Sequence, residues 1–238
     1  MFLPNLKICG ITSRETARFC AEAGVGALGA VFFKKSPRYV TPPQARALFE
    51  GLPERVARVG VFVDMPCLEV IAVAKEAALD TVQLHGSEPL ADIEAAQHAG
   101  FHVIKVLKVT GIALLEAAQA IPETAGILVE CGMGSLPGGN GSVWNWAEAA
   151  PLAAVRPFAL AGGLTPANLL EAARLSNAVA WDISSGVETA PGIKDHAAIL
   201  DLLNRMQPNA TTHLEPFWKI GSSGCTCTPK THPLERNP

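Results

Sequence analysis

The sequence has no long apolar run and no cluster of basic residues. None of its apolar segments approaches the roughly 18 residues that a membrane-spanning helix needs, so we expect no membrane association. The 19 lysine and arginine residues are scattered among 22 aspartate and glutamate residues, and the formal net charge is −3. Without a basic surface stripe, nucleic acid is not an expected partner.

The N-terminus lacks the features of a secretory signal. Its first residues, MFLPNLK, contain neither a charged n-region nor a long apolar stretch. The six cysteines are spread over the whole chain and are not clustered as they are in a small disulfide scaffold. They predict reduced thiols and a cytoplasmic protein.

The sequence does have a regular alternation of short β-rich apolar segments with alanine-rich segments of helical spacing. Its 238 residues, 49% of them apolar, are enough for one sizeable core. The expected strands lie near residues 6–11, 27–33, 58–64, 81–85, 103–109, 125–131, 158–162 and 179–184. The expected helices lie near residues 13–23, 42–51, 67–78, 88–98, 112–120, 146–150, 166–175 and 193–205.

Strict alternation of strands and helices predicts a parallel sheet, because parallel neighbours need a crossover helix. The number and length of these units match a compact (β/α)₈ TIM barrel, which we assign to residues 1–205 as a single domain. An open doubly wound sheet is the rival architecture, but no G-x-G-x-x-G follows the first strand. Residues 206–238 are rich in proline, threonine and serine and predict a disordered tail. We therefore expect truncation after Asn204 to leave folding and activity intact.

In such a barrel the functional residues lie at the carboxyl ends of the strands and in the loops that follow. The segment LKICGIT places Lys7 and Cys9 on the same side of the first strand, just before Gly10. Either Cys9 is a small core residue and Lys7 is tolerated beside it, or both belong to a catalytic site. Arg38 follows the second strand, and Glu130 lies at the end of the sixth.

The loops after the seventh and eighth strands have the composition of an anion site. AGGL contains Gly162 and Gly163, whose backbone can approach an anion closely. DISSGVE contains Ser184, Ser185 and Gly186. Barrel enzymes often bind phosphate with these two loops, so together they predict phosphate binding. The alternative is that the glycines only form tight turns.

Seven short motifs occur in order between residue 6 and about residue 203. They are KICGIT (7–12), SPRYV (36–40), VGVFV (59–63), VQLHG (82–86), GGNGSVWNW (138–146), LAGGLTPAN (160–168) and DISSGVETAPGIKD (182–195). Through these seven motifs and their order, the chain resembles the phosphoribosylanthranilate isomerase family of tryptophan biosynthesis. The resemblance implies an Amadori rearrangement of N-(5′-phosphoribosyl)anthranilate to 1-(2-carboxyphenylamino)-1-deoxyribulose 5-phosphate, with neither a metal nor an organic cofactor.

The resemblance also implies roles for single residues. The reaction needs one group that protonates the furanose ring oxygen and another that removes the C2′ proton. The family's base maps onto Cys9, and Lys7 beside it would favour the thiolate. Arg38 maps onto the arginine that binds the anthranilate carboxylate, for which a planar guanidinium is suited; a solvated loop arginine is the alternative. Asp182 faces inward, either toward polar groups of the substrate or in an ion pair with Lys7 or Lys105.

The chain departs from the family pattern at the general acid. The family has an aspartate at the end of the sixth strand, where this chain has Glu130. We expect Glu130 to be the acid; the alternative is a glutamate that points to solvent. Residues 132–144 predict a lid over the sugar, with Asn140 and Trp144 where the family usually has threonine or serine and phenylalanine. His85 is expected to be a structural hydrogen-bonding residue outside the catalytic set.

Two other functions fit part of the pattern. The isomerase of the histidine pathway performs the same chemistry on a similar barrel, but it has an aspartate where this chain has Cys9. A phosphosugar-binding barrel without catalytic activity is the second. In each case the partner is a small phosphosugar, and we expect a monomer. Cys225 and Cys227, with His213 and His232, have a spacing that fits no standard zinc module, so no metal site is predicted.

Overall fold

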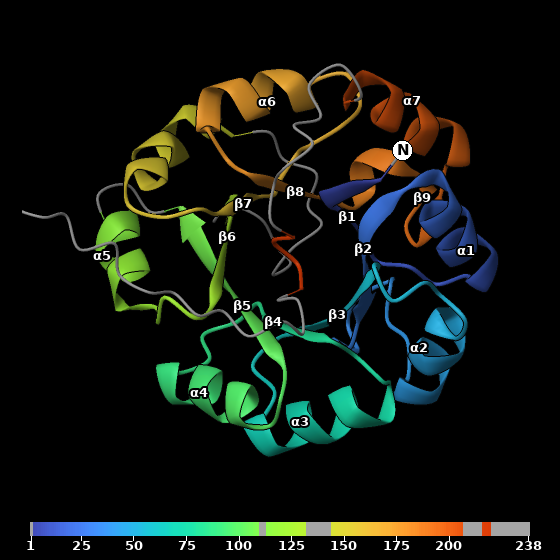
Figure 1. Cartoon of the computed structure of the whole chain (residues 1–238), viewed down its shortest axis with the longest axis horizontal. Helices are drawn as coiled ribbons and strands as arrows, with labels where there is room; N and C mark the ends of the chain where they lie inside the picture. The colour runs from blue at the N-terminus through green and yellow to red at the C-terminus, as the bar shows by residue number, and fades with distance from the viewer. Residues whose placement is uncertain (1, 110–112, 132–143, 207–215, 220–238) are drawn as a thin grey trace, which may run out of the picture.

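Eight parallel strands close into a barrel in chain order, as Figure 1 shows. This computed structural model describes residues 2–109, 113–131, 144–206 and 216–219. The strands are β1 (Leu3–Cys9), β2 (Val25–Val31), β3 (Ala57–Phe62), β4 (Thr81–Leu84), β5 (His102–Val109), β6 (Gly126–Cys131), β7 (Ala159–Leu160) and β8 (Ala180–Ile183). Pairing of β1 with β8 completes the ring. The predicted (β/α)₈ barrel is confirmed.

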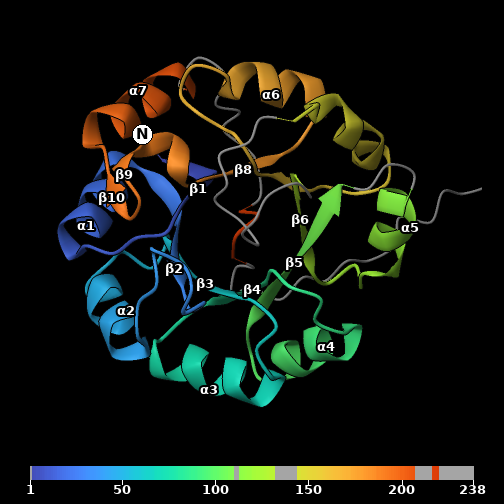
Figure 2. The same cartoon turned by 180° about the vertical axis from the view of Figure 1, so that it is seen from behind.

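Helices surround the strands, as the view from behind in Figure 2 also shows. They are α1 (Arg14–Ala23), α2 (Pro42–Phe49), α3 (Cys67–Glu76), α4 (Leu90–His98), α5 (Ala113–Ala120), the 3₁₀ helix η1 (Trp146–Ala154), α6 (Leu169–Ser176) and α7 (His196–Met206). Pro151 lies inside η1, where its missing N–H disfavours an α-helix. Among the described residues, none of the helices is long and apolar enough to cross a membrane.

The first helices begin where polar side chains can cap them. The Ser13 side chain accepts a hydrogen bond from the Thr16 N–H at the start of α1. At the start of α2, Thr41 and Gln44 form a reciprocal capping box. Such caps satisfy N–H groups that have no partner within the helix, and they fix where each helix begins after its loop.

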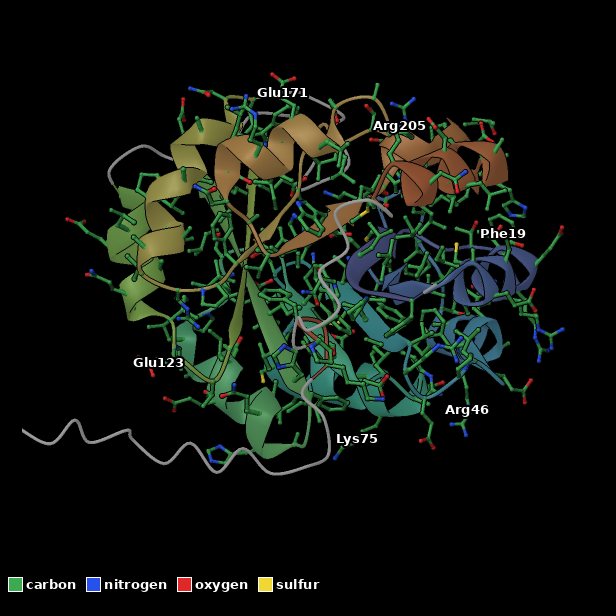
Figure 3. All side chains as sticks on the ribbon, turned by 45° about the horizontal axis from the view of Figure 1, so that its top comes forward. Phe19, Arg46, Lys75, Glu123, Glu171 and Arg205 are labelled. Atoms are coloured by element: carbon green, nitrogen blue, oxygen red, sulfur yellow. The ribbon has the colours of Figure 1, made fainter. Side chains whose placement is uncertain are left out.

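The apolar residues form one layer between strands and helices and another inside the barrel. The outer layer includes Leu6, Ile8 and Leu28 from the strands, packed against residues such as Ala17 and Cys20 of α1. Figure 3 shows the charged side chains of Arg46, Lys75, Glu123, Glu171 and Arg205 at the periphery of the molecule, and all five are exposed. The helices therefore bury one face against the barrel and leave the other in water.

The segment after β8 differs from the prediction. A short 3₁₀ helix, η2 (Ser185–Val187), precedes a hairpin of β9 (Glu188–Ala190) and β10 (Ile193–Lys194). The last helix, expected from residue 193, begins instead at His196 because Asp195 Oδ1 accepts from the N–H groups of Ala197 and Ala198.

Four residues of the segment expected to be a disordered tail have a defined place in the barrel. Pro216–Lys219, drawn in red, lies at the centre of the ring of strands in Figures 1 and 2. Trp218 is 1% exposed and packs inside the barrel with Ala27, Ala57 and Ala180. The expectation from composition is therefore corrected for these four residues, because an aromatic pair within a polar segment can bury itself in an interior lined by small side chains.

Candidate active site

An open pocket lies at the carboxyl ends of the strands, with an empty volume of about 790 Å³. Eight of the ten site residues predicted from the sequence line it, namely Cys9, Arg38, Glu130, Gly162, Gly163, Asp182, Ser184 and Ser185. The other two, Lys7 and Gly186, are not part of the lining. Val31, Phe33 and Val61 give the same pocket an apolar wall.

Lys7 lies inside the barrel and forms an ion pair with Asp182. Its Nζ atom is 2.7 Å from Asp182 Oδ2, and the Lys7 side chain is fully buried. The sequence left open whether Asp182 pairs with Lys7 or with Lys105. Lys105 pairs with Glu88 instead, and its Nζ atom lies 2.6 Å from Glu88 Oε2. Asp182 Oδ1 is buried and has no hydrogen-bond partner among the described residues. Among the described residues, the Asp182 carboxylate is therefore paired through Oδ2 alone.

The electrostatics of Cys9 balance burial against the charge of Lys7. Both side chains converge above Gly29, where a Cβ atom would lie 3.0 Å from Cys9 Sγ and 3.1 Å from Lys7 Cε. Burial raises the pKa of the Cys9 thiol and outweighs the lowering by Lys7; Asp182 raises it further. Burial also opposes the charge on Lys7, but Asp182 and Cys9 outweigh it and the pKa of Lys7 is raised. Lys7 thus favours the thiolate as expected, while burial favours the protonated thiol.

Glu130 lies at the end of a hydrogen-bonded chain of three side chains. Its Oε2 atom is 2.7 Å from His85 Nε2, and His85 Nδ1 is 3.2 Å from Gln83 Nε2. His85 and Glu130 are only 7% and 8% exposed, so the glutamate does not point into bulk solvent. His85 has the hydrogen-bonding role expected of it, and its partner is the carboxyl group assigned as the acid. Its ring therefore fixes where that carboxyl group lies.

Arg38 is tied to the segment after β8. Its Nε and Nη2 atoms donate to Glu188 at 2.9 and 2.6 Å. Lys194 Nζ also donates a hydrogen bond to Glu188, at 2.7 Å from its Oε1 atom. Burial would raise the pKa of Glu188, but the hydrogen bonds from Arg38 and Lys194 outweigh it and hold that pKa below its usual range. Arg38 is thus a buried, paired arginine and not a solvated one.

Three consecutive carbonyl groups after β7 are occupied by side-chain donors. Trp144 Nε1 donates to the carbonyl oxygen of Ala161 at 3.0 Å, Trp146 Nε1 to that of Gly162 at 3.2 Å, and Asn168 Nδ2 to that of Gly163 at 2.9 Å. Gly162 and Gly163 have φ angles of 89° and 69°, which glycine adopts at little cost. Their N–H groups have no acceptor among the described residues, as an anion site requires. The tryptophan at 144 adds a donor that a phenylalanine would lack.

The loop after β8 lies directly against this glycine loop. A Cβ atom on Gly186 would lie 1.9 Å from the carbonyl oxygen of Leu164, so only glycine allows this approach. Ser184 Oγ donates a hydrogen bond to the carbonyl oxygen of Cys9 at 3.0 Å. This is the hydroxyl group that we expected to bind phosphate, and its proton is already used in that bond. Gly186 thus lies where the two loops pack against each other, and Ser185 lies on the pocket wall.

Some predicted features lie outside the described residues. These are Asn140, most of the expected lid at 132–144, and the cysteines and histidines of the C-terminal segment. Within the described part of the chain, no three His, Cys, Asp or Glu side chains are grouped as a metal site would need.

Sequence reasoning assigned no role to Gln83, and it missed Glu188 and Lys194 as members of the network around Arg38. Gln83 and His85 share a face of β4 by their spacing of two, which could have signalled the first. Glu188 and Lys194 lie within the quoted motif DISSGVETAPGIKD, but only the folded hairpin shows that they pair with each other and with Arg38.

The fold and the site define a (β/α)₈-barrel protein with titratable groups and two glycine-containing loops around one pocket at the carboxyl ends of its strands. Residues 6–205 match the family model described as N-(5′-phosphoribosyl)anthranilate (PRA) isomerase. The chain is 42% identical over 201 residues to the N-(5′-phosphoribosyl)anthranilate isomerase of Geobacter sulfurreducens, covering 84% of this chain and 97% of that protein. The corresponding protein of Paramagnetospirillum magneticum is 44% identical over 80% of this chain and 91% of its own.

Solved structures agree with this assignment. Phosphoribosyl anthranilate isomerase from Thermus thermophilus superposes with a TM-score of 0.79 at 38% identity, covering 87% of this chain and all of that one. A phosphoribosyl anthranilate isomerase in complex with reduced 1-(o-carboxyphenylamino)-1-deoxyribulose 5-phosphate superposes with a TM-score of 0.76 at 35% identity over the same shares. The chain belongs to the N-(5′-phosphoribosyl)anthranilate isomerase family, which confirms the resemblance found in the sequence.

Proposed function

We propose that this chain catalyses the rearrangement of N-(5′-phosphoribosyl)anthranilate to 1-(2-carboxyphenylamino)-1-deoxyribulose 5-phosphate in tryptophan biosynthesis. The observation that carries the proposal is that one pocket joins a thiol, a carboxyl group and the glycine loop, with Cys9, Glu130 and Gly162 all in its lining. The family membership of residues 6–205 supports the same reaction.

The substrate has three parts, and the pocket has a matching surface for each. The N–H groups of Gly162 and Gly163, with the neighbouring Ser185, suit the phosphate. The apolar wall of Val31 and Val61 suits the anthranilate ring. Arg38 lines the same pocket, and its Nη1 atom is not used in the two bonds to Glu188, so it can hold the carboxylate.

The reaction then needs a proton at the ring oxygen and the removal of one from C2′. We assign the first step to Glu130, whose proton passes to the furanose oxygen as the ring opens to a Schiff base. Cys9, in its thiolate form, takes the C2′ proton to give the enolamine, and returns a proton to C1′ as the ketone forms. The proton of the 2′-hydroxyl goes back to Glu130, so the enzyme ends as it began.

Two neighbours support these roles. Lys7 increases the fraction of Cys9 in the thiolate form against the effect of burial. His85 holds the Glu130 carboxyl group at 2.7 Å, which compensates for the greater freedom of a glutamate relative to an aspartate. Asp182 also lines the pocket, and we assign its unpaired oxygen, Oδ1, to a hydroxyl group of the sugar.

The test is to add the purified chain to freshly made phosphoribosylanthranilate and to follow the loss of anthranilate-type fluorescence. We expect a loss faster than the spontaneous decay of the substrate, and none above that decay with Cys9→Ser. If the wild-type chain binds the reduced product analogue but does not speed the loss, the protein is a phosphosugar-binding barrel without this activity.

We further propose that the chain works as a monomer in the cytoplasm, with the strands and helices of its barrel domain in residues 1–205. Cys9, Cys20 and Cys67 are free thiols, which agrees with a reducing compartment. Sedimentation equilibrium of the purified chain tests the oligomeric state, and a mass of twice 25.0 kDa would contradict the proposal.

A further inference from the structure

The end of the barrel opposite the pocket is built mostly from small side chains. The first residues of six consecutive strands, β3 to β8, are Ala57, Thr81, His102, Gly126, Ala159 and Ala180. Barrel interiors are usually filled by branched residues such as valine, isoleucine and leucine. Here the strands themselves leave space at this end.

Residues 216–219, which we call the plug, occupy that space. The Phe217 N–H donates to Asn5 Oδ1 at 3.0 Å, and Thr81 Oγ1 donates to the carbonyl oxygen of Trp218 at 2.7 Å. Lys219 Nζ lies 3.5 Å from Asp80 Oδ1 and donates to the carbonyl oxygen of Glu54. Anchors on β1, on β4 and before β3 hold the plug in one position across the barrel.

The indole of Trp218 faces the charged group inside the barrel. Lys7 Nζ lies 5.5 Å from the centroid of the Trp218 ring. Trp218 Nε1 is buried and has no hydrogen-bond partner among the described residues, so no hydrogen bond from the ring nitrogen determines its placement. What the ring provides is an aromatic face beneath a desolvated ammonium group, which attracts the positive charge.

Lys7 connects this face to the pocket. It forms the ion pair with Asp182 and converges with Cys9 above Gly29, whereas Trp218 is not in the lining of the pocket. We propose that Trp218 is a positioning residue that acts through Lys7. It holds the ammonium group against Asp182 and Cys9 and keeps water from reaching Lys7 through the far end of the barrel.

This proposal rests on the proposed function only where turnover is concerned. The charge of Lys7 reaches Cys9 whether or not the chain is an isomerase, so the ionisation of Cys9 reports on Trp218 directly. The measurement is the rate at which iodoacetamide alkylates Cys9 as a function of pH, with the modified cysteine identified by mass spectrometry.

Three substitutions separate an aromatic face from simple filling of space. Trp218→Phe keeps an aromatic ring, Trp218→Leu keeps apolar volume without one, and Trp218→Ala removes both. We expect the phenylalanine variant to alkylate at the wild-type rate. The leucine and alanine variants should alkylate about threefold to tenfold more slowly at neutral pH, because a screened or displaced Lys7 opposes the raised pKa of Cys9 less well. Phe217→Leu is the matched control, since it alters the plug but not the ring beneath Lys7.

The outcomes are distinct. If Trp218→Leu alkylates with the wild-type pH profile, Trp218 only fills space and the proposal is overturned; the same follows if Trp218→Phe is as slow as Trp218→Leu. This comparison remains decisive if Trp218→Ala does not fold. In turnover, the leucine variant should lower kcat with KM unchanged. Absence of turnover in the wild-type chain would refute the proposed function, while the alkylation profile would still decide the role of Trp218.

Discussion

At the scale of single residues, the pocket holds two proton carriers that are controlled in different ways. Cys9 lies among apolar side chains, next to Val31 and Val61, and depends on the charge of Lys7. Glu130 depends on orientation, because His85 holds its carboxyl group in place. A substitution at either carrier should therefore act on the chemical step and leave most of the binding surface intact.

Replacing Cys9 with serine should lower kcat by about 10²-fold or more, the range typical of a lost general base. The hydroxyl is a far weaker base than a thiolate at neutral pH, while the apolar wall and the glycine loop stay in place. Steady-state kinetics and titration with the reduced product analogue measure the two effects. Cys67→Ser, on α3 and outside the pocket lining, serves as the control. Near-normal turnover of Cys9→Ser would remove this residue from the mechanism.

Glu130→Gln keeps the size of the side chain and removes the exchangeable proton. We expect it to retain less than about a tenth of the wild-type kcat. Glu130→Asp is the informative companion, because it keeps the acid but shifts it by one methylene group. A misplacement of about 1 Å can cost on the order of 10²-fold in rate. Retention of more than a tenth of kcat by the glutamine variant would show that Glu130 is not the acid.

At the scale of elements, a buried network joins the loop after β2 to the hairpin after β8. Arg38 contributes from the first and Glu188 and Lys194 from the second. Removal of one cation leaves Glu188 paired with the other, so the hairpin should keep its place.

Arg38→Ala should therefore raise KM by about 10- to 100-fold and change kcat little. A charge-assisted hydrogen bond to the anthranilate carboxylate is worth about 1.5–3 kcal/mol, which corresponds to this range. Arg14→Ala removes an exposed arginine in an ion pair with Glu50 and should leave both constants unchanged. An unaltered KM in Arg38→Ala would mean that the carboxylate is held elsewhere.

The start of β5 makes stability depend on pH. Burial lowers the pKa of His102 from 6.5 to about 4. Between these two pH values the imidazole is protonated in the unfolded chain but neutral in the folded chain. The free energy of unfolding is therefore highest above pH 6.5 and falls as the pH drops toward 4. The loss should reach about 3 kcal/mol.

Urea denaturation between pH 7 and pH 4 measures this loss, with His102→Gln as the control. The glutamine variant keeps a polar side chain of similar length that does not titrate. Its unfolding midpoint should fall less steeply with decreasing pH than that of the wild-type chain. Parallel curves for the two proteins would show that His102 does not account for the pH dependence.

At the scale of the whole molecule, the plug makes the C-terminal segment part of the barrel. Trp218 buries an indole of about 150–250 Å², and at about 25 cal/mol per Å² its transfer from water contributes roughly 4–6 kcal/mol before the cost of ordering the segment. Truncation after Met206 should therefore destabilise the chain by about 2–4 kcal/mol and lower Tm by roughly 5–15 °C. This reverses the expectation from composition.

Differential scanning calorimetry of the full and truncated chains checks this prediction. Truncation after Lys219 is the control, because it keeps the plug and removes only the residues beyond it. An unchanged Tm after truncation at Met206 would show that the plug contributes no net stability.

The barrel and most of the pocket could be predicted from the sequence because their signals are local. Alternating apolar segments mark the strands, and Cys9, Glu130 and Gly162 follow strand ends directly. The plug could not be predicted this way. Its seat is made by single small residues such as Ala57 and Ala180, which are far apart in the chain and ordinary in their own strands.

The plug also sets an order of events during synthesis. Asn5 and Phe217, which share a hydrogen bond, are 212 residues apart. At about 5–20 residues per second, translation makes the strand that carries Lys7 roughly 10–40 s before the indole that lies beneath it. A nascent chain on the ribosome can close all eight strands while Lys7 still lacks its aromatic neighbour. The interior of the barrel is completed only when Trp218 has left the exit tunnel, after all eight strands have been made.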